Sequence, residues 1–551
     1  MSNKKWEKGT DPVTGLPEMH VFLQDAYKRA QKDLSDGTYP SCASVCFNVA
    51  NFKQYNNLYG FQAGDECLKG IAGILAEVFE DDEICRQSAD TFLVMVRQDV
   101  VVSRVEEACR RVNAFLANPG IQMKAGIRMV DKNVDVMKEQ GGLFDQAMTA
   151  CDSIKHDRNH SWAFYTQEMG KYFADRNYIL EHFESALENG DLRVCFQPIV
   201  RSLTGKFCNS EALSRWEARD YGSIRPDTFI KVLEEVKLIH RLDLFVLNKV
   251  AEILRHEIDH GIPYVPVSIN FSRLDFILMN PFEEVENVVK KYNLSSDLIC
   301  IEITETALLE DKTVLSDAID HFRNAGYQVW LDDFGSGYSS LNVLQDFMPD
   351  EIKLDMAFLR NYSEKSRKLI TAIIIMAKTM GLHTLAEGVE TKEQADFLTA
   401  IGCEKMQGYY YARPMYMDMA VNYPEQSKIN VETPEEEKLL NRAGAVNVVT
   451  DAPLGLLLFD GSFRMLYVNE ACRLGFAEYG FDTLEKINQA VNDAEQPWHA
   501  GFLRLAYAAK EEGSRSLVHE ETGRYVHVTF TKLSEAGSLT LFQIELQNLD
   551  R

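Results

Sequence analysis

Eight apolar runs in the middle of the chain share one feature, because each ends in a polar residue or is followed at once by one. In chain order these polar residues are Gln197, Glu211, Asn270, Glu302, the adjacent pair Asp332 and Asp333, Lys353, Glu387 and Gln407. Oxygen ligands without histidine or cysteine suit Mg²⁺ or Mn²⁺ rather than a structural Zn²⁺. Two such cations can clamp a phosphodiester and activate water for an in-line displacement, and a nearby lysine can position that water. The residue types therefore indicate metal-dependent hydrolysis of a phosphodiester.

Each of these residues also has an ordinary structural interpretation. A single carboxylate at the end of a strand commonly caps a helix or lies in a solvated turn. The adjacent carboxylates of Asp332 and Asp333 favour a ligand role, because two charges after a buried run repel each other unless a cation lies between them. A shared location for several carboxylates would strengthen that interpretation, since a buried anionic cluster is tolerated mainly as a metal site.

The elements that must bring these residues together are the eight strands themselves. From Asp191 to about Pro414 the chain alternates strand-like runs with helix-like segments. A closed barrel of this kind places the carboxyl ends of its strands on one rim, where active sites of that architecture are built. We therefore expect a (β/α)8 barrel similar to the TIM barrel, with the polar residues gathered in one cup.

The sequence around these positions resembles the EAL domain of bacterial signalling proteins. Glu211-Ala212-Leu213 carries the motif that names the family, and further motifs follow the family order. These are Gln197-Pro198-Ile199, Asn270-Phe271-Ser272, Glu302-Ile303-Thr304-Glu305, Asp332-Asp333-Phe334-Gly335, Lys353-Leu354-Asp355, Glu387-Gly388-Val389-Glu390 and Gln407-Gly408-Tyr409. We expect the EAL domain to occupy residues 171–422.

This resemblance implies hydrolysis of cyclic di-GMP to the linear dinucleotide pGpG with two Mg²⁺ or Mn²⁺ ions. The implied metal ligands are Glu211, Asn270, Glu302, Asp332, Asp333 and Glu387. The implied catalytic residues are Glu211, Lys353, which serves the attacking water, and Glu305, which anchors the loop after the aspartate pair. The implied substrate contacts are Gln197, Arg215, Glu390 and Gln407. EAL domains often pair through their barrels, so the resemblance also implies a homodimer.

Residues 1–170 form an α/β segment that resembles the GGDEF domain of diguanylate cyclases. The resemblance rests on the stretch from Asp11 to Pro17, on the stretch from Phe52 to Asn57, and on Gly64-Asp65. The loop that names the family reads Ser88-Ala89-Asp90-Thr91-Phe92, so both glycines are absent. Side chains at these positions obstruct the close approach of a triphosphate to the backbone.

The metal-binding part of this first domain is also incomplete. Asn48 and Ala50 stand where the family has aspartates, so we expect a degenerate GGDEF domain without cyclase activity. Asn56 and Asp65 fall where the family reads the guanine edge, although Phe61 replaces the usual histidine. Two hypotheses stay open, namely a GTP-binding regulator and a folded scaffold.

The last part of the chain is expected to hold a linker, residues 423–444, and a small α+β domain, residues 445–551. The stretch from Ala452 to Asp460 and the stretch from Met465 to Phe476 resemble a PAS sensor domain. The segment lacks the cysteine-containing flavin motif of light sensors, and His499 and His519 are isolated. The ligand of this PAS-like domain is therefore left unknown.

Composition restricts the partners and the compartment. The formal net charge of -25 argues against a nucleic-acid polymer or an anionic membrane surface as the main partner, since both attract basic proteins. The eleven cysteines lie singly and without a CxxC pair, which indicates a reducing cytoplasm. No apolar run approaches the roughly 18 residues that a membrane span requires, so we expect a cytoplasmic location.

The sequence thus predicts an α/β multidomain protein whose EAL domain hydrolyses cyclic di-GMP under the control of its two flanking domains. The alternative is a receptor that holds cyclic di-GMP, or a protein-interaction module, without turnover. The complete set of candidate ligands favours the enzyme. Net synthesis of cyclic di-GMP is opposed by the altered loop at residues 88–92.

Overall fold

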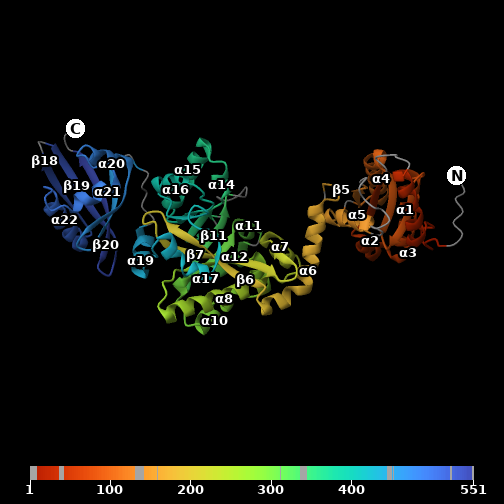
Figure 1. Cartoon of the computed structure of the whole chain (residues 1–551), viewed down its shortest axis with the longest axis horizontal. Helices are drawn as coiled ribbons and strands as arrows, with labels where there is room; N and C mark the ends of the chain where they lie inside the picture. Colours follow the sequence, from red (N-terminus) through yellow and green to blue (C-terminus); the bar gives the residue numbers. More distant parts are fainter. Residues whose placement is uncertain are drawn as a thin grey trace. The chain divides into compact units, whose positions relative to one another are not determined.

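The chain divides into two compact units, residues 1–181 and residues 182–551 (Figure 1). The structure is a computed structural model that describes residues 9–35, 42–118, 120–130, 142–157, 159–310, 312–335, 344–345, 347–443, 450, 452–521 and 524–548. Within these ranges, no helix is both long and apolar enough to cross a membrane. All eleven cysteines are buried, and none of them forms a disulfide.

The first unit is built on a five-stranded sheet with the order β2-β3-β1-β4-β5. The central strand β1 runs antiparallel to β3 and β4, whereas β4 and β5 are parallel. The strands are β1 (Cys42–Ala50), β2 (Glu83–Ser88), β3 (Thr91–Arg97), β4 (Gln122–Met129) and β5 (Trp162–Phe164). The helices are α1 (Met19–Ser35), α2 (Phe52–Tyr59), α3 (Phe61–Val78), α4 (Val101–Leu116) and α5 (Gly142–Ser153), with a 3-10 turn η1 (Gln98–Val100).

Strand β1 is buried on both faces, because helices cover both sides of this sheet. Val45 and Phe47 pack into a core with α3 and α4, whereas Cys42 and Cys46 pack with α1 and α5. Successive side chains of a strand point to opposite faces, which explains the division between the two cores. The long helix α6 (Gln167–Asn189) runs across the boundary between the two units.

Eight strands of the second unit close into a barrel. Around the barrel they follow the order β6, β7, β9, β10, β11, β12, β13 and β14, and β14 pairs again with β6. They are β6 (Leu192–Arg201), β7 (Phe207–Ala218), β9 (Val267–Asn270), β10 (Ile299–Thr304), β11 (Gln328–Phe334), β12 (Glu351–Leu354), β13 (His383–Ala386) and β14 (Lys405–Gln407). Two short strands pair antiparallel with the barrel: β8 (Gly222–Ile224) pairs with β7, and β15 (Met415–Tyr416) pairs with β6.

One strand of the barrel corrects the expectation that all eight strand ends meet at one rim. Strands β7 and β9 to β14 are parallel, but β6 runs antiparallel to both of its neighbours. Only residues 202–206 separate β6 from β7, and a parallel crossover needs about a dozen residues or more. Gln197 therefore lies in the middle of its strand, where the register pairs it with Glu211.

The helices around the barrel begin at ordinary sequence signals. The Asn280 side chain accepts a hydrogen bond from the Glu283 amide just before a proline, and Thr391 and Gln394 form a capping box. The helices are α7 (Pro226–Glu235), α8 (Ile239–His260), α9 (Arg273–Leu278), α10 (Pro281–Lys291), α11 (Glu305–Glu310), α12 (Lys312–Asn324), α14 (Ala357–Arg360), α15 (Glu364–Thr379), α16 (Lys392–Ala400), α17 (Met417–Ala420) and α18 (Tyr423–Ser427), with a 3-10 turn η2 (Ser296–Leu298).

The second unit contains a further sheet, which follows helix α19 (Pro434–Ala443) in the chain. All of its strands are antiparallel to their neighbours, and their order is β17-β16-β20-β19-β18. Its strands are β16 (Leu454–Phe459), β17 (Phe463–Val468), β18 (Ser514–Glu521), β19 (Arg524–Ala536) and β20 (Leu539–Asn548). Its helices are α20 (Glu470–Ala477), α21 (Leu484–Asn492) and α22 (His499–Glu512). Leu457 and Phe459 face α21 and α22, whereas Leu456 and Leu458 pack with Leu439 of α19. Helices thus cover both faces of this sheet.

A buried pair of acidic residues lies beside the barrel, where α8 meets α9. Asp275 is fully buried and Asp243 is 9% exposed. Burial, together with the neighbouring Asp275, raises the pKa of Asp243 well above its ordinary value. Burial raises the pKa of Asp275 to about 6. Neither oxygen of the Asp275 side chain has a hydrogen-bond partner among the described residues, so a proton on this pair is favoured over two buried negative charges.

We expect Asp275→Asn to stabilise the protein at pH 8 by about 1–3 kcal/mol, since the raised pKa makes the charged form of Asp275 costly. The stability that the bound proton provides is complete below about pH 4 and is lost as the pH rises through about 6, so the gain should be much smaller at pH 4.5 than at pH 8. Urea unfolding at both pH values measures the difference. The exposed Asp220→Asn serves as the control, and equal gains at both pH values would contradict the prediction.

Candidate active site

The ammonium group of Lys353 lies inside the barrel among four carboxylates. Its Nζ atom is 2.7 Å from Glu302 Oε2 and 2.8 Å from Glu387 Oε1. It is 3.1 Å from Asp332 Oδ1 and 3.6 Å from Glu211 Oε1. Burial alone would lower the pKa of Lys353, but the surrounding carboxylates raise it well above its ordinary value. Lys353 therefore stays positively charged although it is fully buried.

Five different strands supply this cluster, and two amides orient one of its carboxylates. Glu211 lies on β7, and Asn270 ends the neighbouring strand β9. Asn270 Nδ2 donates to Glu211 Oε1 at 3.1 Å, and Gln407 Nε2 donates to Glu211 Oε2 at 2.8 Å. Both oxygens of Glu211 are thereby fixed, because an amide from each side holds one of them.

A local irregularity of β11 brings two adjacent aspartates into the site. The pairing of β11 with β12 shifts between Leu331 and Phe334, so Asp332 and Asp333 lie in a bulge. Asp333 has a φ of 56°, in the left-handed region that favours glycine, and its amide donates to Asp332 Oδ1 at 2.9 Å. In a regular strand these two side chains would point to opposite faces. The bulge therefore allows both to reach one site.

Crowding and burial raise the pKa of several carboxyl groups in the cluster. Burial raises the pKa of Glu387 to about 8, with the nearby Asp332 and Glu211 adding to the effect and Lys353 opposing it. Burial, Asp332 and Asp355 raise the pKa of Asp333 to about 6. Such groups bind a proton or a cation in preference to standing charged side by side.

The donor set fits divalent metal ions. Asp332, Asp333 and Glu387 can each offer an oxygen atom such that the three atoms lie within 4.8 Å of one another. Glu302 Oε1 is buried and has no hydrogen-bond partner among the described residues. Glu211 adds a fifth carboxylate to Asp332, Asp333, Glu387 and Glu302. The five carboxylates and the one ammonium group of Lys353 carry a net charge of four negative units, which two divalent cations would balance. All of the donors are oxygen atoms, the type that Mg²⁺ and Mn²⁺ prefer.

The remaining residues expected in the site make contacts outside the group around Lys353. Glu305 Oε2 accepts a hydrogen bond from the Gly335 amide at 3.0 Å, so it holds the turn that follows the aspartate pair. Gln197 Nε2 donates to the Ala412 carbonyl at 3.4 Å, and Arg215 Nη1 donates to the Ser214 carbonyl at 2.8 Å. Glu390 is exposed.

Sequence reasoning gave no role to Asp355, although the structure places it next to the site. Its side chain shares a hydrogen bond with Asp333 and also accepts one from the Ala357 amide at 2.5 Å. The signal was available, because Asp355 lies two residues beyond Lys353 and the two-residue period of a strand places both on one face.

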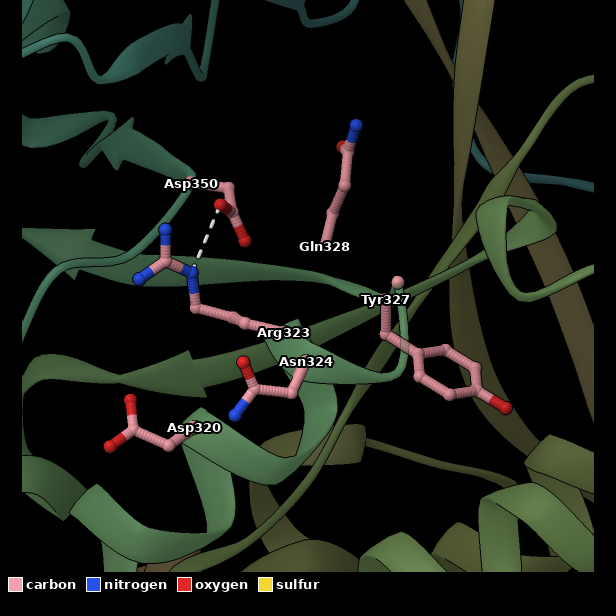
Figure 2. Close-up of a pocket in the computed structure, with 7 residues that line it drawn as sticks. Asp320, Arg323, Asn324, Tyr327, Gln328 and Asp350 are labelled. Atoms are coloured by element: carbon pink, nitrogen blue, oxygen red, sulfur yellow. Dashed lines mark hydrogen bonds and ion pairs between the residues drawn. The ribbon is translucent and has the colours of Figure 1, made fainter.

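A separate depression of about 430 Å³ lies away from this cluster (Figure 2). Its lining consists of Asp320, Arg323, Asn324, Gly326, Tyr327, Gln328 and Asp350. Arg323 Nε lies 3.1 Å from Asp350 Oδ1, and a dashed line marks this ion pair in Figure 2. Gln328 begins β11 and Asp350 precedes β12, so the depression lies at the amino ends of strands whose carboxyl ends carry the candidate site.

The first unit holds the second set of candidate residues. Ala89 has a φ of 41° in the turn between β2 and β3, and its carbonyl accepts a hydrogen bond from Arg86 Nε at 2.8 Å. Asn48 Nδ2 donates to Thr91 Oγ1 at 3.0 Å. Asn56 Oδ1 is buried without a hydrogen-bond partner among the described residues and lies 2.0 Å from the position that a Cβ would take on Gly64. Asn56 therefore packs against Gly64, the residue that precedes Asp65.

Comparison with known families finds two domains in the chain. Residues 8–159 match the family model described as diguanylate cyclase, GGDEF domain. Residues 180–414 match the family model described as EAL domain. The EAL match covers every residue of the group around Lys353.

Curated relatives are similar to about three quarters of the chain. The cyclic di-GMP phosphodiesterase PdeR of Escherichia coli K12 is 30% identical over 417 residues, which cover 74% of this chain and 62% of PdeR. The bifunctional diguanylate cyclase/cyclic di-GMP phosphodiesterase MucR of Pseudomonas aeruginosa is 28% identical over 416 residues, 74% of this chain and 60% of MucR. The chain thus spans less than two thirds of the length of either relative. A solved structure described as the PaMucR phosphodiesterase with c-di-GMP is 30% identical over 44% of this chain and 99% of its own, with a TM-score of 0.42.

We expect Lys353→Met to lower the stability of the metal-free protein by about 3–5 kcal/mol, because it leaves the buried carboxylates without their cation. For the same reason Mn²⁺ should raise the melting temperature of this variant more than that of the wild type. Thermal unfolding in EDTA and in Mn²⁺ measures both effects. Lys368→Met, which removes an exposed lysine paired with Glu364, is the control, and equal metal responses in wild type and Lys353→Met would refute the prediction.

Proposed function

Because the chain carries a GGDEF domain followed by an EAL domain, we propose that the EAL domain is a phosphodiesterase that hydrolyses cyclic di-GMP to pGpG with two Mg²⁺ or Mn²⁺ ions. The observation that carries the proposal is the set of four carboxylates in contact with Lys353, which includes the unpaired Glu302 Oε1, together with the neighbouring Asp333. The curated relative PdeR, named as a cyclic di-GMP phosphodiesterase, supports the substrate.

The proposed metal ligands all lie at the carboxyl ends of the parallel strands or in the middle of β7. They are Glu211, Asn270, Glu302, Asp332, Asp333 and Glu387. When bound, the ions would polarise the phosphoryl group and generate a nucleophilic hydroxide from water at neutral pH. The protein's own contribution begins with Asn270 and Gln407, which hold both oxygens of Glu211 in place.

Lys353 has the position and the charge to serve the attacking water. Its buried ammonium can donate a hydrogen bond that orients the water and offsets the negative charge that develops on the phosphorane oxygens. Glu305 keeps the turn after Asp333 closed through the Gly335 amide. In the proposal Gln197, Arg215, Glu390 and Gln407 bind the dinucleotide, and Arg215 lies four residues beyond Glu211 on the same face of β7.

We propose that the GGDEF domain has lost cyclase activity and binds GTP as a regulator. The Asn48 amide, which stands in place of a carboxylate, makes a neutral hydrogen bond with Thr91. Asn56, which packs against Gly64, and Asp65, the residue after Gly64, offer an amide and a carboxylate, the groups needed to read a guanine edge. The PAS-like interpretation of residues 445–551 is supported by the five-stranded antiparallel sheet and its helices. Homodimerisation of the EAL domain completes the proposal.

Incubation of the full-length protein with cyclic di-GMP and Mg²⁺ or Mn²⁺ should yield pGpG, and EDTA should abolish the reaction because the carboxylates need a counter-cation to engage a phosphate. Glu211→Ala should lower the rate by at least about 100-fold, since even residues that only support metal ligands account for 10–100-fold. Chromatography of the products measures the rate. The exposed Glu217→Gln on the same strand is the matched control.

The result that would contradict the enzyme is the absence of pGpG under both metals from a folded protein. Binding of cyclic di-GMP measured by calorimetry in that same sample would then favour the alternative, a receptor without turnover. Cyclic di-GMP formed from GTP would contradict the loss of cyclase activity.

Titration with GTP should change the rate of pGpG formation if the GGDEF domain is a regulator. Asn56→Ala should weaken that response by about tenfold in GTP concentration, since a lost hydrogen bond to a buried polar group costs about 1–3 kcal/mol. The rate without GTP should be unchanged. A scaffold without a ligand is indicated if calorimetry detects no GTP binding and the rate does not respond.

A further inference from the structure

Two buried cations lie opposite each other at the end of the barrel away from Lys353. Arg201 ends β6 and Lys405 begins β14, and the antiparallel register pairs these two residues directly. Each is 2% exposed. Like charges directly opposite each other on neighbouring strands are destabilising, and a buried charge is tolerated only when it is paired. This end of the barrel therefore requires negative charge close by.

The barrel itself supplies a partner for Lys405. Lys405 Nζ lies 2.7 Å from Glu351 Oε2, and both side chains are almost fully buried. The same Nζ lies 4.5 Å from the centroid of the Trp330 ring, within the range of a cation–π interaction. Burial alone would lower the pKa of Lys405, but Glu351 raises it, so the residue stays charged.

Arg201 obtains its partner from outside the barrel, from residues 430–443, which we term the floor segment. Arg201 Nε donates to Glu432 Oε1 at 3.2 Å and Arg201 Nη2 donates to Glu432 Oε2 at 3.1 Å. The same Nη2 donates to Asn441 Oδ1 at 2.9 Å. Glu432 is 1% exposed at its side chain, so this is a buried bidentate ion pair.

Backbone and further charged contacts attach the floor segment to the barrel. The Phe207 amide donates to the Asn430 carbonyl at 2.9 Å, and the Glu432 amide donates to the Phe207 carbonyl at 2.8 Å, beside the start of β7. Lys206 Nζ lies 2.7 Å from Glu436 Oε2. Burial raises the pKa of the Glu437 carboxyl, and the positive charges of Lys405 and Arg201 oppose that rise. The segment thus brings the Glu432 carboxylate to Arg201, and the charge of Glu437 interacts with both cations.

These charges lie one layer of side chains below the candidate active site. Glu351 precedes Lys353 by two residues on β12, and Lys405 precedes Gln407 by two residues on β14. Residues two apart on a strand point to the same face, so each pair faces the barrel interior. On each of these two strands a single residue lies between the charged residue and the residue of the candidate active site. The Cα atoms of Glu351 and Lys353, like those of Lys405 and Gln407, are therefore about 7 Å apart.

The opposite side of the floor segment packs on the C-terminal sheet. Leu439 and Leu440 share a buried cluster with Leu454, Leu456, Leu458, Leu466 and Leu541. Ser534 Oγ of β19 donates to the Leu439 carbonyl at 2.8 Å. Helix α19 is therefore held on one side by the C-terminal domain and on the other by the cations of the barrel floor.

We propose that the floor segment is a positioning element of the active site, which balances Arg201 and Lys405 and thereby fixes β12 and β14 so that Lys353 and Gln407 keep their places. It is also the physical connection through which the C-terminal domain acts on the site. Its effect on turnover rests on the phosphodiesterase activity proposed above, whereas its effect on the barrel does not.

Glu432→Gln in the full-length protein tests this proposal, because it keeps the shape of the side chain and removes its charge. We expect kcat for pGpG formation to fall about tenfold, as for other residues that support metal ligands, with KM within about twofold. Hydrogen–deuterium exchange should become faster in peptides that contain residues 351–354 and 405–407. Glu435→Gln, an exposed change three residues further along the floor segment, should alter neither quantity.

A double variant separates a charge effect from a packing effect. Arg201→Met combined with Glu432→Met removes both charges and keeps apolar volume, so it should restore slow exchange in residues 351–354 and 405–407 compared with Glu432→Gln. Lys206→Met, which breaks only the partly exposed pair with Glu436, provides a milder variant if Glu432→Gln does not fold, and it should accelerate exchange in the same peptides.

Unchanged exchange in β12 and β14 of folded Glu432→Gln would overturn the proposal, as would an equal effect of Glu435→Gln or a double variant that exchanges as fast as the single one. The exchange measurement needs no turnover. A wild-type protein without hydrolysis would therefore refute the proposed phosphodiesterase activity, while the exchange result would still decide the role of the floor segment.

Discussion

The structure of the second unit depends on the charge of one buried lysine. The Lys353 ammonium is fully buried, and in a medium of low polarity it is stable only because carboxylates from four other strands approach it within 3.6 Å. The converse also holds, since those carboxylates could not lie so close together without a cation. A closed barrel meets both requirements, because it directs side chains from many strands toward one axis.

The need to gather carboxylates around Lys353 also explains where the backbone departs from regular strand geometry. Two adjacent aspartates can enter one site only if the alternation of the strand is interrupted, and the bulge at Asp332 with the positive φ of Asp333 provides that interruption. Strain of this kind persists only where the surroundings impose it. Here the hydrogen bond from the Gly335 amide to Glu305 holds the turn that follows.

Much of the site could be predicted from the sequence, because apolar runs of four to eight residues that end in polar residues identify buried strands and their ends. All eight runs form strands of the barrel. The direction of β6 was missed because alternation carries no information on strand direction, although the five-residue connection to β7 excludes a parallel crossover. The sequence of β18, with Ser514, Arg515 and Glu520 among its residues, is mostly polar and gives little sign of a strand, as suits its place at the edge of the sheet beside β19.

The burial of Glu432 could not be predicted for a different reason. The stretch from Thr433 to Lys438 has the composition of a solvated linker, and the partner that buries Glu432 is Arg201, more than 200 residues earlier in the chain. A charged residue is buried only when a specific partner compensates it, so its burial is a property of the pair and not of the local sequence. The barrel therefore contains two charged layers of different origin. The Lys353 layer is assembled around the barrel strands, whereas the Arg201 layer is completed by a segment that also packs on the C-terminal sheet. The ion pair between Arg201 and Glu432 therefore connects the barrel to the element that contacts that sheet.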